Sequence, residues 1–132
     1  SDVYKRQGFL ADQDGYIHGL PVPFLGQPSS AVVGPATFAK KFGSPVVPIF
    51  TSRKPEGGHI VHILPPLHYN NSGDDDVDMY TLTEECVRVT EDFIREHPDE
   101  WIWFQHRWMT KMSEIVDYYK KLEIRERAHE KQ

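Results

Sequence analysis

The sequence predicts an α/β fold, and two patterns carry this prediction. Residues 1–68 contain short apolar runs bounded by Pro and Gly, which are typical of strands. A helix-like segment ends two residues before one of these runs, and a helix followed closely by a strand is typical of an α/β unit. The chain has 132 residues, and a chain of this size buries roughly two thirds of its unfolded surface. We therefore expect one domain with a real core.

Composition excludes several classes of protein. Hydrophobic residues make up 39% and charged residues 27% of the chain, so it is not wholly disordered. No apolar run approaches the roughly 20 residues of a membrane-spanning helix, and residues 1–7 lack the apolar segment of a signal peptide. The single cysteine excludes an intramolecular disulfide. A net charge of −5 argues against a nucleic-acid partner, because nucleic acid needs a basic surface.

The N-terminal part is predicted to contain two extended segments and a helix. Residues 8–11 are apolar and predict the end of a buried strand. Residues 20–26 contain two prolines, each of which removes a hydrogen-bond donor, so we expect an edge strand or an extended segment. Pro35 suits the first turn of a helix and Gly43 suits its left-handed end, which predicts a helix over 34–42.

Residues 45–64 are predicted to form a β-hairpin. Apolar runs at 45–50 and 59–64 flank the segment 54–58, whose Lys-Pro-Glu-Gly-Gly sequence favours a turn. Residues 70–78 follow; they are polar and acidic, and predict a solvated loop.

The C-terminal half is predicted to be helical. One helix is expected to begin at Thr81, with Glu84 completing a capping box, and to stop at His97–Pro98. Its apolar residues are spaced by four, three and four positions and form one stripe of Leu82, Cys86, Val89 and Phe93. A short helix is expected to start at Pro98, and a peripheral, highly charged helix is expected over 113–127.

Two pairs of charged residues are candidates for catalysis or binding. Asp12 and Asp14 follow the first predicted strand, where ligand crevices form in open α/β sheets. Two carboxylates two residues apart on an extended chain point the same way and can orient a base or accept a substrate hydroxyl, although Asp14 and the glycine after it also fit a simple turn. Arg53 and Lys54 end a predicted strand and can bind phosphate or carboxylate, although a solvated hairpin end is the favoured explanation from the residues alone.

The remaining candidates favour structural roles. His59 and His62 are three residues apart on a predicted strand, so they lie on opposite faces and cannot share a metal ion. The acidic residues of 74–85 match part of a calcium loop, but Met79 stands where that loop needs Gly. The three tryptophans of 101–108 fit a membrane interface or an acyl-chain wall, but core packing is the commoner reason for such a cluster.

Several short motifs occur in a characteristic order between residues 8 and 111. They are LADQD at 10–14, VPFLG at 22–26, GPA at 34–36, PVVP at 45–48, PPL at 65–67, PDEW at 98–101 and RW at 107–108. In order and spacing they resemble the bacterial lipid A biosynthesis acyltransferases, the lauroyl and myristoyl transferases of lipopolysaccharide assembly. Gln105 departs from the family, which often has His there, and Leu25 replaces a frequent Phe.

The resemblance covers only the C-terminal half of that family. The family also has an N-terminal membrane anchor and a His-x4-Asp/Glu motif, whose imidazole is expected to deprotonate the acceptor hydroxyl. None of the seven histidines here has an acidic residue five positions later. We therefore expect a non-family segment at 1–7, half of an acyltransferase domain at 8–111, and a charged helical tail at 112–132. The fold implied is the C-terminal part of a three-layer α/β/α sandwich like that of the glycerolipid acyltransferases, with a short β-hairpin and a helical tail.

The function implied by the resemblance is acyl transfer from an acyl carrier protein thioester to a hydroxyl of a lipid A precursor. It implies a place at the cytoplasmic face of the bacterial inner membrane, reached through the missing anchor. Asp12 and Asp14 would lie at the catalytic crevice. The implied substrate-binding residues, which would hold the phosphorylated sugar or the thioester or line an acyl groove, are Arg53, Arg107, Phe24 and Trp108. No metal or cofactor is expected, and the chain alone is predicted to be inactive and marginally stable.

Two alternatives stay open from the sequence. One is a self-contained, non-catalytic α/β binding module, against which an uncovered apolar face beside Phe9 and Leu10 would count. The other is a fragment of a glycerophospholipid acyltransferase, which acts on a smaller acceptor. The segments at 12–14 and 100–101 favour the lipid A branch of the resemblance.

Overall fold

The computed structural model describes residues 6–101 and 106–131, so Trp103 and Gln105 lie outside the described residues. The described residues form three α-helices, two pairs of short antiparallel strands and several 3-10 turns. In chain order the elements are η2 (Tyr16–His18), β1 (Leu20–Pro21), β2 (Ser30–Ala31), α1 (Gly34–Phe42), β3 (Ile49–Arg53), β4 (His59–Ile63), α2 (Asp75–Glu96), η3 (Pro98–Glu100), η4 (Met112–Glu114) and α3 (Tyr118–Glu130).

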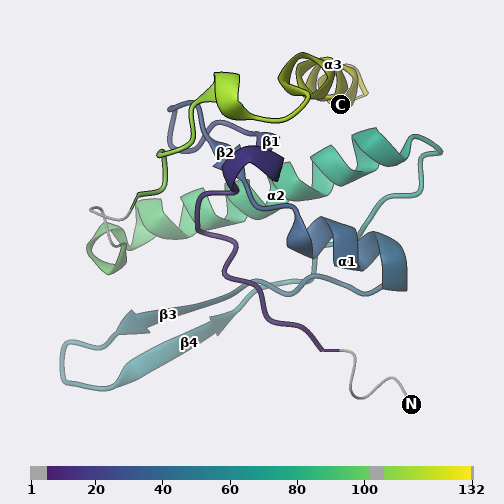
Figure 1. The fold of residues 1–132 in the computed structure, drawn as a ribbon. Coiled ribbons are helices and arrows are strands. Elements are labelled where there is room, and N and C mark those ends of the chain that lie inside the picture. Colours follow the sequence, from purple (N-terminus) through teal and green to yellow (C-terminus); the bar gives the residue numbers. More distant parts are fainter. Residues whose placement is uncertain (1–5, 102–105, 132) are drawn as a thin grey trace.

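Helix α2 runs through the middle of the molecule (Figure 1). The β1–β2 pair and α3 lie on one side of it, and α1 and the β3–β4 hairpin lie on the other. Two hydrophobic clusters result. The larger cluster joins α2 to β1, β2 and α3 through buried residues that include Tyr80, Val87 and Ile124. The smaller cluster joins α2 to α1 through Leu82 and Ala39. The prediction of one apolar stripe was therefore incomplete, because α2 buries two sides.

The start of α2 differs from the prediction. The helix begins at Asp75 rather than Thr81, so the prediction of a solvated loop was wrong for 75–78. Asp74 is the N-cap, and its carboxylate accepts a hydrogen bond of 3.2 Å from the Val77 N–H. Acidic residues fill the first turn because carboxylates are favoured near the positive end of the helix dipole.

The two predictions with the strongest local signals are confirmed. Helix α1 spans the predicted residues, and Gly43 ends it with a left-handed φ of 65°. The hairpin also forms, with Ile49 paired to Ile63 and Arg53 paired to His59. Its first strand begins later than predicted, because the prolines at 45 and 48 cannot donate to a ladder.

The predicted strand over 8–11 was wrong. No strand pairs with this segment among the described residues, and a lone strand leaves its backbone groups without ladder partners. Phe9 and Leu10 are exposed at 39% and 72%. The segment 20–26 was predicted as an edge strand or an extended segment. Leu20–Pro21 forms the strand β1, and Phe24 adds an isolated antiparallel bridge to Gln27.

The C-terminal tail is helical, but its α-helix spans Tyr118–Glu130 rather than the predicted 113–127. A 3-10 turn, η4, precedes α3, and α3 packs on α2 through the buried residues Ile124 and Ala128. Tyr119 was expected on the apolar side of this helix and is instead 80% exposed. No helix of the described residues is long and apolar enough to cross a membrane.

Candidate functional site

An apolar cleft of about 960 Å³ opens between the N-terminal segment, α1, α2 and the hairpin. Its walls are mostly aliphatic and aromatic side chains, among them Leu10, Phe38, Val47, Phe50, Phe93 and Ile94. Phe50 and Phe93 stack with their ring centroids 4.4 Å apart, so one wall is a packed aromatic pair. Phe9 packs edge-on against Phe38 at 6.0 Å and extends the opposite wall. The cleft therefore suits a long apolar ligand rather than a polar metabolite.

The cleft also has polar lining residues. Those with acidic or imidazole groups are Asp12, His97 and Glu100, and the lining includes Arg6 and Cys86 as well. Asp12 is half-buried and lies at the end of the segment that was predicted as a strand. His97 follows the last turn of α2, and its ring lies 5.3 Å from that of His62. Asp12 thus lines a cleft, although no strand precedes it as the prediction assumed.

Asp14 has a different environment from Asp12. It is buried, at 5% exposure, and it is not among the residues that line the cleft. One carboxylate oxygen accepts from the Thr110 hydroxyl at 2.8 Å and from the Tyr16 N–H at 2.7 Å. The other accepts from the Thr110 N–H at 2.9 Å. These bonds hold two distant segments together, which is a positioning role in the described structure.

Arg107 and Phe24 are buried together on the other side of α2, and the half-buried Trp108 packs against Phe24. Arg107 and Phe24 are each 1% exposed, and the guanidinium carbon lies 4.6 Å from the centre of the Phe24 ring. Arg107 donates to the Ser30 carbonyl at 2.9 Å, and the Trp108 indole donates to the Phe24 carbonyl at 3.2 Å. Burial lowers the pKa of Arg107, while the charges of Asp14 and Asp12 oppose that shift.

Arg53 lies apart from that cluster, at the end of β3. Its side chain is 63% exposed and pairs with Glu100 at 3.4 Å. The Arg53 backbone N–H also donates to the Glu100 carboxylate at 2.9 Å, and this hydrogen bond is the main reason that the pKa of Glu100 is lowered. Arg53 thus reaches the edge of the cleft through Glu100.

Sequence reasoning missed several residues of these arrangements. Thr110 carries no local signal, because its role depends on a partner 96 positions away. Glu91 accepts a hydrogen bond of 2.7 Å from the Leu25 N–H and fixes the turn after Phe24 to α2. Tyr80 is fully buried and donates to the Pro21 carbonyl at 2.9 Å. For Tyr80, the sequence carries one signal: it is an aromatic residue on the second buried face of α2.

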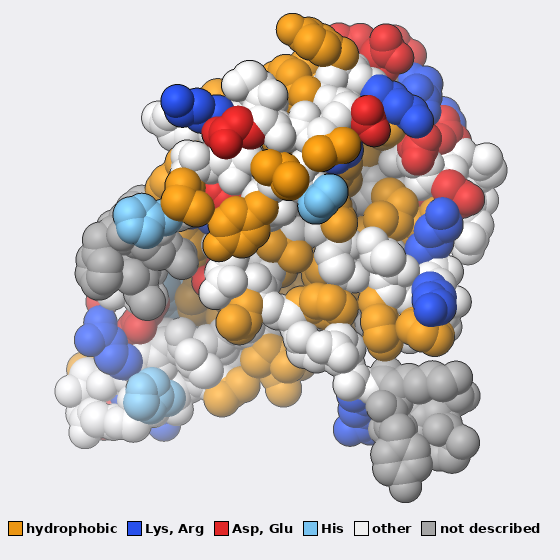
Figure 2. Space-filling model, in the orientation of Figure 1, with side chains coloured by type: hydrophobic (Ala, Val, Ile, Leu, Met, Phe, Trp, Pro, Cys, Tyr) orange, Lys and Arg blue, Asp and Glu red, His pale blue; other side chains and the backbone are white. Residues whose placement is uncertain are grey.

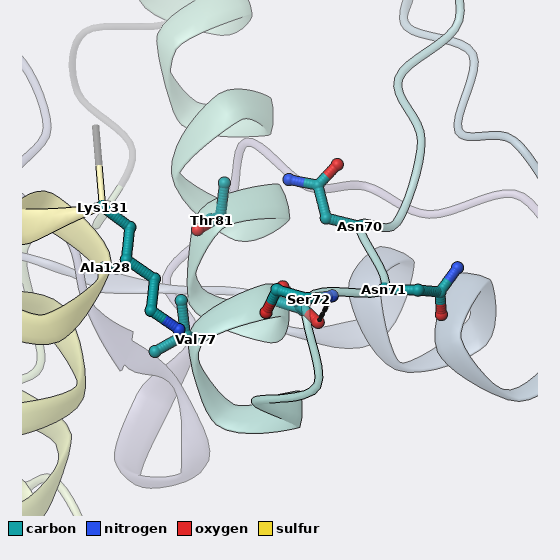
Figure 3. A pocket seen from close by; sticks show the side chains of 8 residues that line it. Asn70, Asn71, Ser72, Val77, Thr81, Ala128 and Lys131 are labelled. Atoms are coloured by element: carbon teal, nitrogen blue, oxygen red, sulfur yellow. Dashed lines mark hydrogen bonds between the residues drawn. The ribbon is translucent and has the colours of Figure 1, made fainter.

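A second, polar pocket of about 410 Å³ lies between the start of α2 and the end of α3 (Figure 3). Asn70, Asn71, Thr81 and Lys131 line it. The Ser72 hydroxyl and N–H donate to the two oxygens of Asp78, at 2.8 and 3.0 Å. The buried Asp78 carboxylate of this pocket is therefore already occupied by hydrogen bonds from Ser72.

Comparison with known families shows to which family the chain belongs. A family model described as bacterial lipid A biosynthesis acyltransferase matches residues 6–110. The chain belongs to the bacterial lipid A biosynthesis acyltransferase family. No curated protein matches the chain at a significant level.

Membership of the lipid A acyltransferase family gives the cleft a chemical context. The family implies acyl transfer in lipid A biosynthesis, with a lipid A precursor as acceptor. The matched region contains every residue that lines the cleft and all the site residues named from the sequence. The helix α3 lies outside it.

Proposed function

We propose that this chain forms the acyl-binding side of a lipid A acyltransferase, whose donor is a fatty acyl thioester on acyl carrier protein. The acceptor is a hydroxyl of a lipid A precursor. The observation that carries the proposal is the apolar cleft with the Asp12 carboxylate among its lining residues. A saturated chain gains from such a cleft because each CH₂ removed from water contributes about 0.8 kcal/mol.

In this reaction the acceptor oxygen attacks the thioester carbonyl. The ester C–O bond forms, the C–S bond breaks, and the hydroxyl proton passes through a base to the departing thiolate. The base would be the imidazole of the family's His-x4-Asp/Glu motif, which these residues do not contain. Asp12 would orient that imidazole or the acceptor hydroxyl at the polar edge of the cleft. Asp14 would hold the loop of Asp12 in place through Thr110.

The other candidate residues take two roles in the proposal. Arg53 is exposed and would bind a phosphate of the acceptor, in exchange for or together with its bond to Glu100. Arg107, Phe24 and Trp108 would support the cleft from behind. Phe24 contacts Trp101 with ring centroids 5.5 Å apart, and Trp101 lines the cleft.

An uncovered apolar face supports a larger assembly. On the face of the hairpin opposite Phe50 and His62, which pack against Phe93 of α2, Val61 and Ile63 are exposed at 58% and 69%. Contiguous exposed apolar side chains mark a surface that another element covers. We infer that a further part of the domain covers this face, carries the base and completes a three-layer α/β/α sandwich at the cytoplasmic face of the inner membrane. The same exposure, together with that of Leu10, argues against a self-contained binding module.

Binding of the acyl chain is testable with a matched pair of variants. Leu10 and Ile63 have nearly equal exposures of 72% and 69%, but only Leu10 lines the cleft. L10D should weaken binding of a lauroyl thioester in calorimetric titration by about tenfold, because a carboxylate in an apolar cleft is costly to desolvate. I63D should leave the affinity unchanged. Equal affinities of both variants and the unaltered chain would contradict the assignment of the cleft.

The transfer reaction needs a separate experiment. The chain alone, given a lauroyl thioester of acyl carrier protein and a lipid A precursor, should form no product. Co-expression with a family segment that carries the His-x4-Asp/Glu motif should restore transfer, and D12N should lower the restored kcat by roughly 10²–10⁴-fold. Turnover by the chain alone, or full activity of D12N, would refute these roles. Preference for a glycerophosphate acceptor in a competition assay would instead assign the chain to the glycerophospholipid branch.

A further inference from the structure

The apolar cleft follows the axis of α2. The residues of this helix and its C-cap that line the cleft are Cys86, Thr90, Phe93, Ile94 and His97. They are spaced by three or four positions, so they lie on one side of the helix. Because each residue of an α-helix rises 1.5 Å, the axial distance from Cys86 to His97 is about 16 Å. The cleft is therefore long as well as apolar.

An extended stretch of the protein runs beside α2 in the same direction and forms a second wall. Residues 44–51 all line the cleft. Val46 packs with Cys86 against one buried cluster, and further along the Phe50 ring stacks on Phe93. In Figure 2 hydrophobic side chains gather along the lower side of the view, between the hairpin and the N-terminal segment of Figure 1. The two walls therefore follow one line from Cys86 to the end of α2.

The two ends of this line differ in chemistry. His97 and Glu100 lie at the end near the C-terminus of α2, and Glu100 accepts a hydrogen bond from the exposed Arg53. At the other end, Leu82 lies one turn before Cys86, is 1% exposed and does not line the cleft. The buried cluster that contains Leu82 thus closes the cleft beyond Cys86. A ligand with a polar head and an apolar tail fits this cleft with its tail towards Cys86.

The side chains at the closed end are small and make no polar demand on a ligand. Ala39 lines the cleft there and is 1% exposed, and Cys86 is half-buried. Burial raises the pKa of the Cys86 thiol to about 11, so it stays protonated and behaves as a small apolar group. One turn along the helix, the Thr90 hydroxyl donates to the Cys86 carbonyl at 2.9 Å. A saturated acyl chain can therefore lie against these residues without leaving a polar group unpaired.

We propose that Cys86 stops the terminal methyl group of the acyl chain and so sets the longest chain that the cleft accepts. This inference rests on the proposed function and adds the orientation of the acyl chain, with the thioester near His97 and Glu100. Carbon–carbon bonds of about 1.5 Å at near-tetrahedral angles advance a straight chain by about 1.25 Å per bond. The distance of about 16 Å along α2 thus holds a saturated acyl chain of roughly 12–14 carbons.

A closed end gives affinity a characteristic dependence on the length of the acyl chain. Each CH₂ that enters the cleft leaves water, which should tighten binding about fourfold. A carbon beyond the limit either stays in water and adds nothing, or it pushes into the cluster around Leu82 and Ala39. The second outcome weakens binding, because a packed core resists added volume. Affinity should therefore rise with length and then level off or fall.

Calorimetric titration with coenzyme A thioesters of straight saturated acids tests this inference. Over a series of roughly 8 to 18 carbons, the affinity of the unaltered protein should stop rising at about 14. C86F should move this limit to shorter acyl chains by about two to three carbons, because the ring fills the closed end. T90F places the same ring one turn, about 6 Å, nearer the polar end, so it should shorten the limit by about five carbons more.

Two matched controls separate length selection from other effects of substitution. C86A removes the thiol without adding volume. V89F adds the same ring to α2 at a half-buried residue that does not line the cleft. Both controls should keep the limit of the unaltered protein. The Tm of every variant is measured beside each titration, and C86L, which adds less volume, takes the place of C86F if the ring prevents folding.

The outcomes distinguish this inference from the proposal on which it rests. If the thioesters bind but affinity rises without a limit, or if the limit is the same in C86F or C86L as in the unaltered protein, Cys86 is not the stop and the acyl cleft still stands. A limit that moves equally in C86A and C86F would trace the effect to the thiol and also overturn the inference. If the unaltered protein binds no thioester of any length, the acyl cleft itself is wrong and the inference fails with it.

Discussion

Thr110 donates both its backbone N–H and its hydroxyl to the buried carboxylate of Asp14, across 96 positions of sequence. The distances are 2.9 and 2.8 Å. This pair joins the segment that carries Asp12 to the segment that carries Arg107. It therefore fixes one edge of the proposed acyl cleft, and the same carboxylate also holds the backbone N–H of Tyr16.

Replacing Asp14 should destabilise the fold more than replacing Asp12. D14N places an amide NH₂ where a carboxylate oxygen accepts hydrogen bonds, leaving buried donors unpaired at a cost of about 1–3 kcal/mol. D12N should change the free energy of unfolding in urea by less than about 0.5 kcal/mol, since Asp12 is half-buried. Equal free energies of unfolding for the two variants would contradict the positioning role of Asp14.

Loss of the Arg107 side chain should lower the free energy of unfolding more than loss of the Arg53 side chain. R107M removes a guanidinium that is 1% exposed, lies against Phe24 and binds the Ser30 carbonyl. We expect a loss of about 2–4 kcal/mol in the free energy of unfolding, because the partners of a buried charged group are left without it. R53M removes an exposed ion pair and should cost at most about 1 kcal/mol. Chemical denaturation measures the free energy of unfolding of both variants. Equal losses for R107M and R53M would mean that Arg107 has no structural role and is free to bind substrate.

The buried hydroxyl of Tyr80 should contribute measurably to stability. Y80F deletes the hydrogen bond to the Pro21 carbonyl, which should lower the free energy of unfolding by about 1 kcal/mol. Desolvation also raises the pKa of Tyr80, in keeping with a phenol that stays protonated. Y119F, at a side chain that is 80% exposed, is the control and should leave the Tm unchanged. A shift in Tm of the same size for both variants would argue against this hydrogen bond.

The cap of α2 should make stability fall in acid. The pKa of Asp74 is lowered from 3.8, first by the hydrogen bond from Val77 and then by that from Arg127. A carboxyl whose pKa is lower in the folded state stabilises the fold above its unfolded pKa, and this contribution is lost as the pH falls through the folded value. The difference in unfolding free energy between the chain and D74N should thus shrink below about pH 4. The Asn side chain still caps but does not titrate, so a pH-independent difference would contradict the assignment.

The elements predicted correctly from sequence are those set by local chemistry. Pro35 and Gly43 fix the ends of α1 without help from the rest of the chain. The start of α2 was misplaced because Asp74 and the acids after it match a solvated loop as well as a helix cap. The run at 8–11 was taken for a strand because apolar residues say nothing of whether a pairing strand is present.

The candidate site was predictable only in part. Asp12 was expected at a crevice from its place in the chain, and it lines the cleft. Phe24 and Arg107 were expected to contact substrate, and the structure buries both in one cluster. Nothing in a sequence separates a buried cation from a substrate-binding one, because the difference depends on which segments cover it. The role of Thr110 depends in the same way on a tertiary contact.

The central position of α2 has a consequence for how the molecule comes apart. The two hydrophobic clusters have no buried residue in common, yet each is anchored on this 22-residue helix. Fraying of the helix on one side removes the support of the other, so neither half has an independent melting transition. Heat should therefore open the fatty-chain cleft and detach α3 in the same cooperative step.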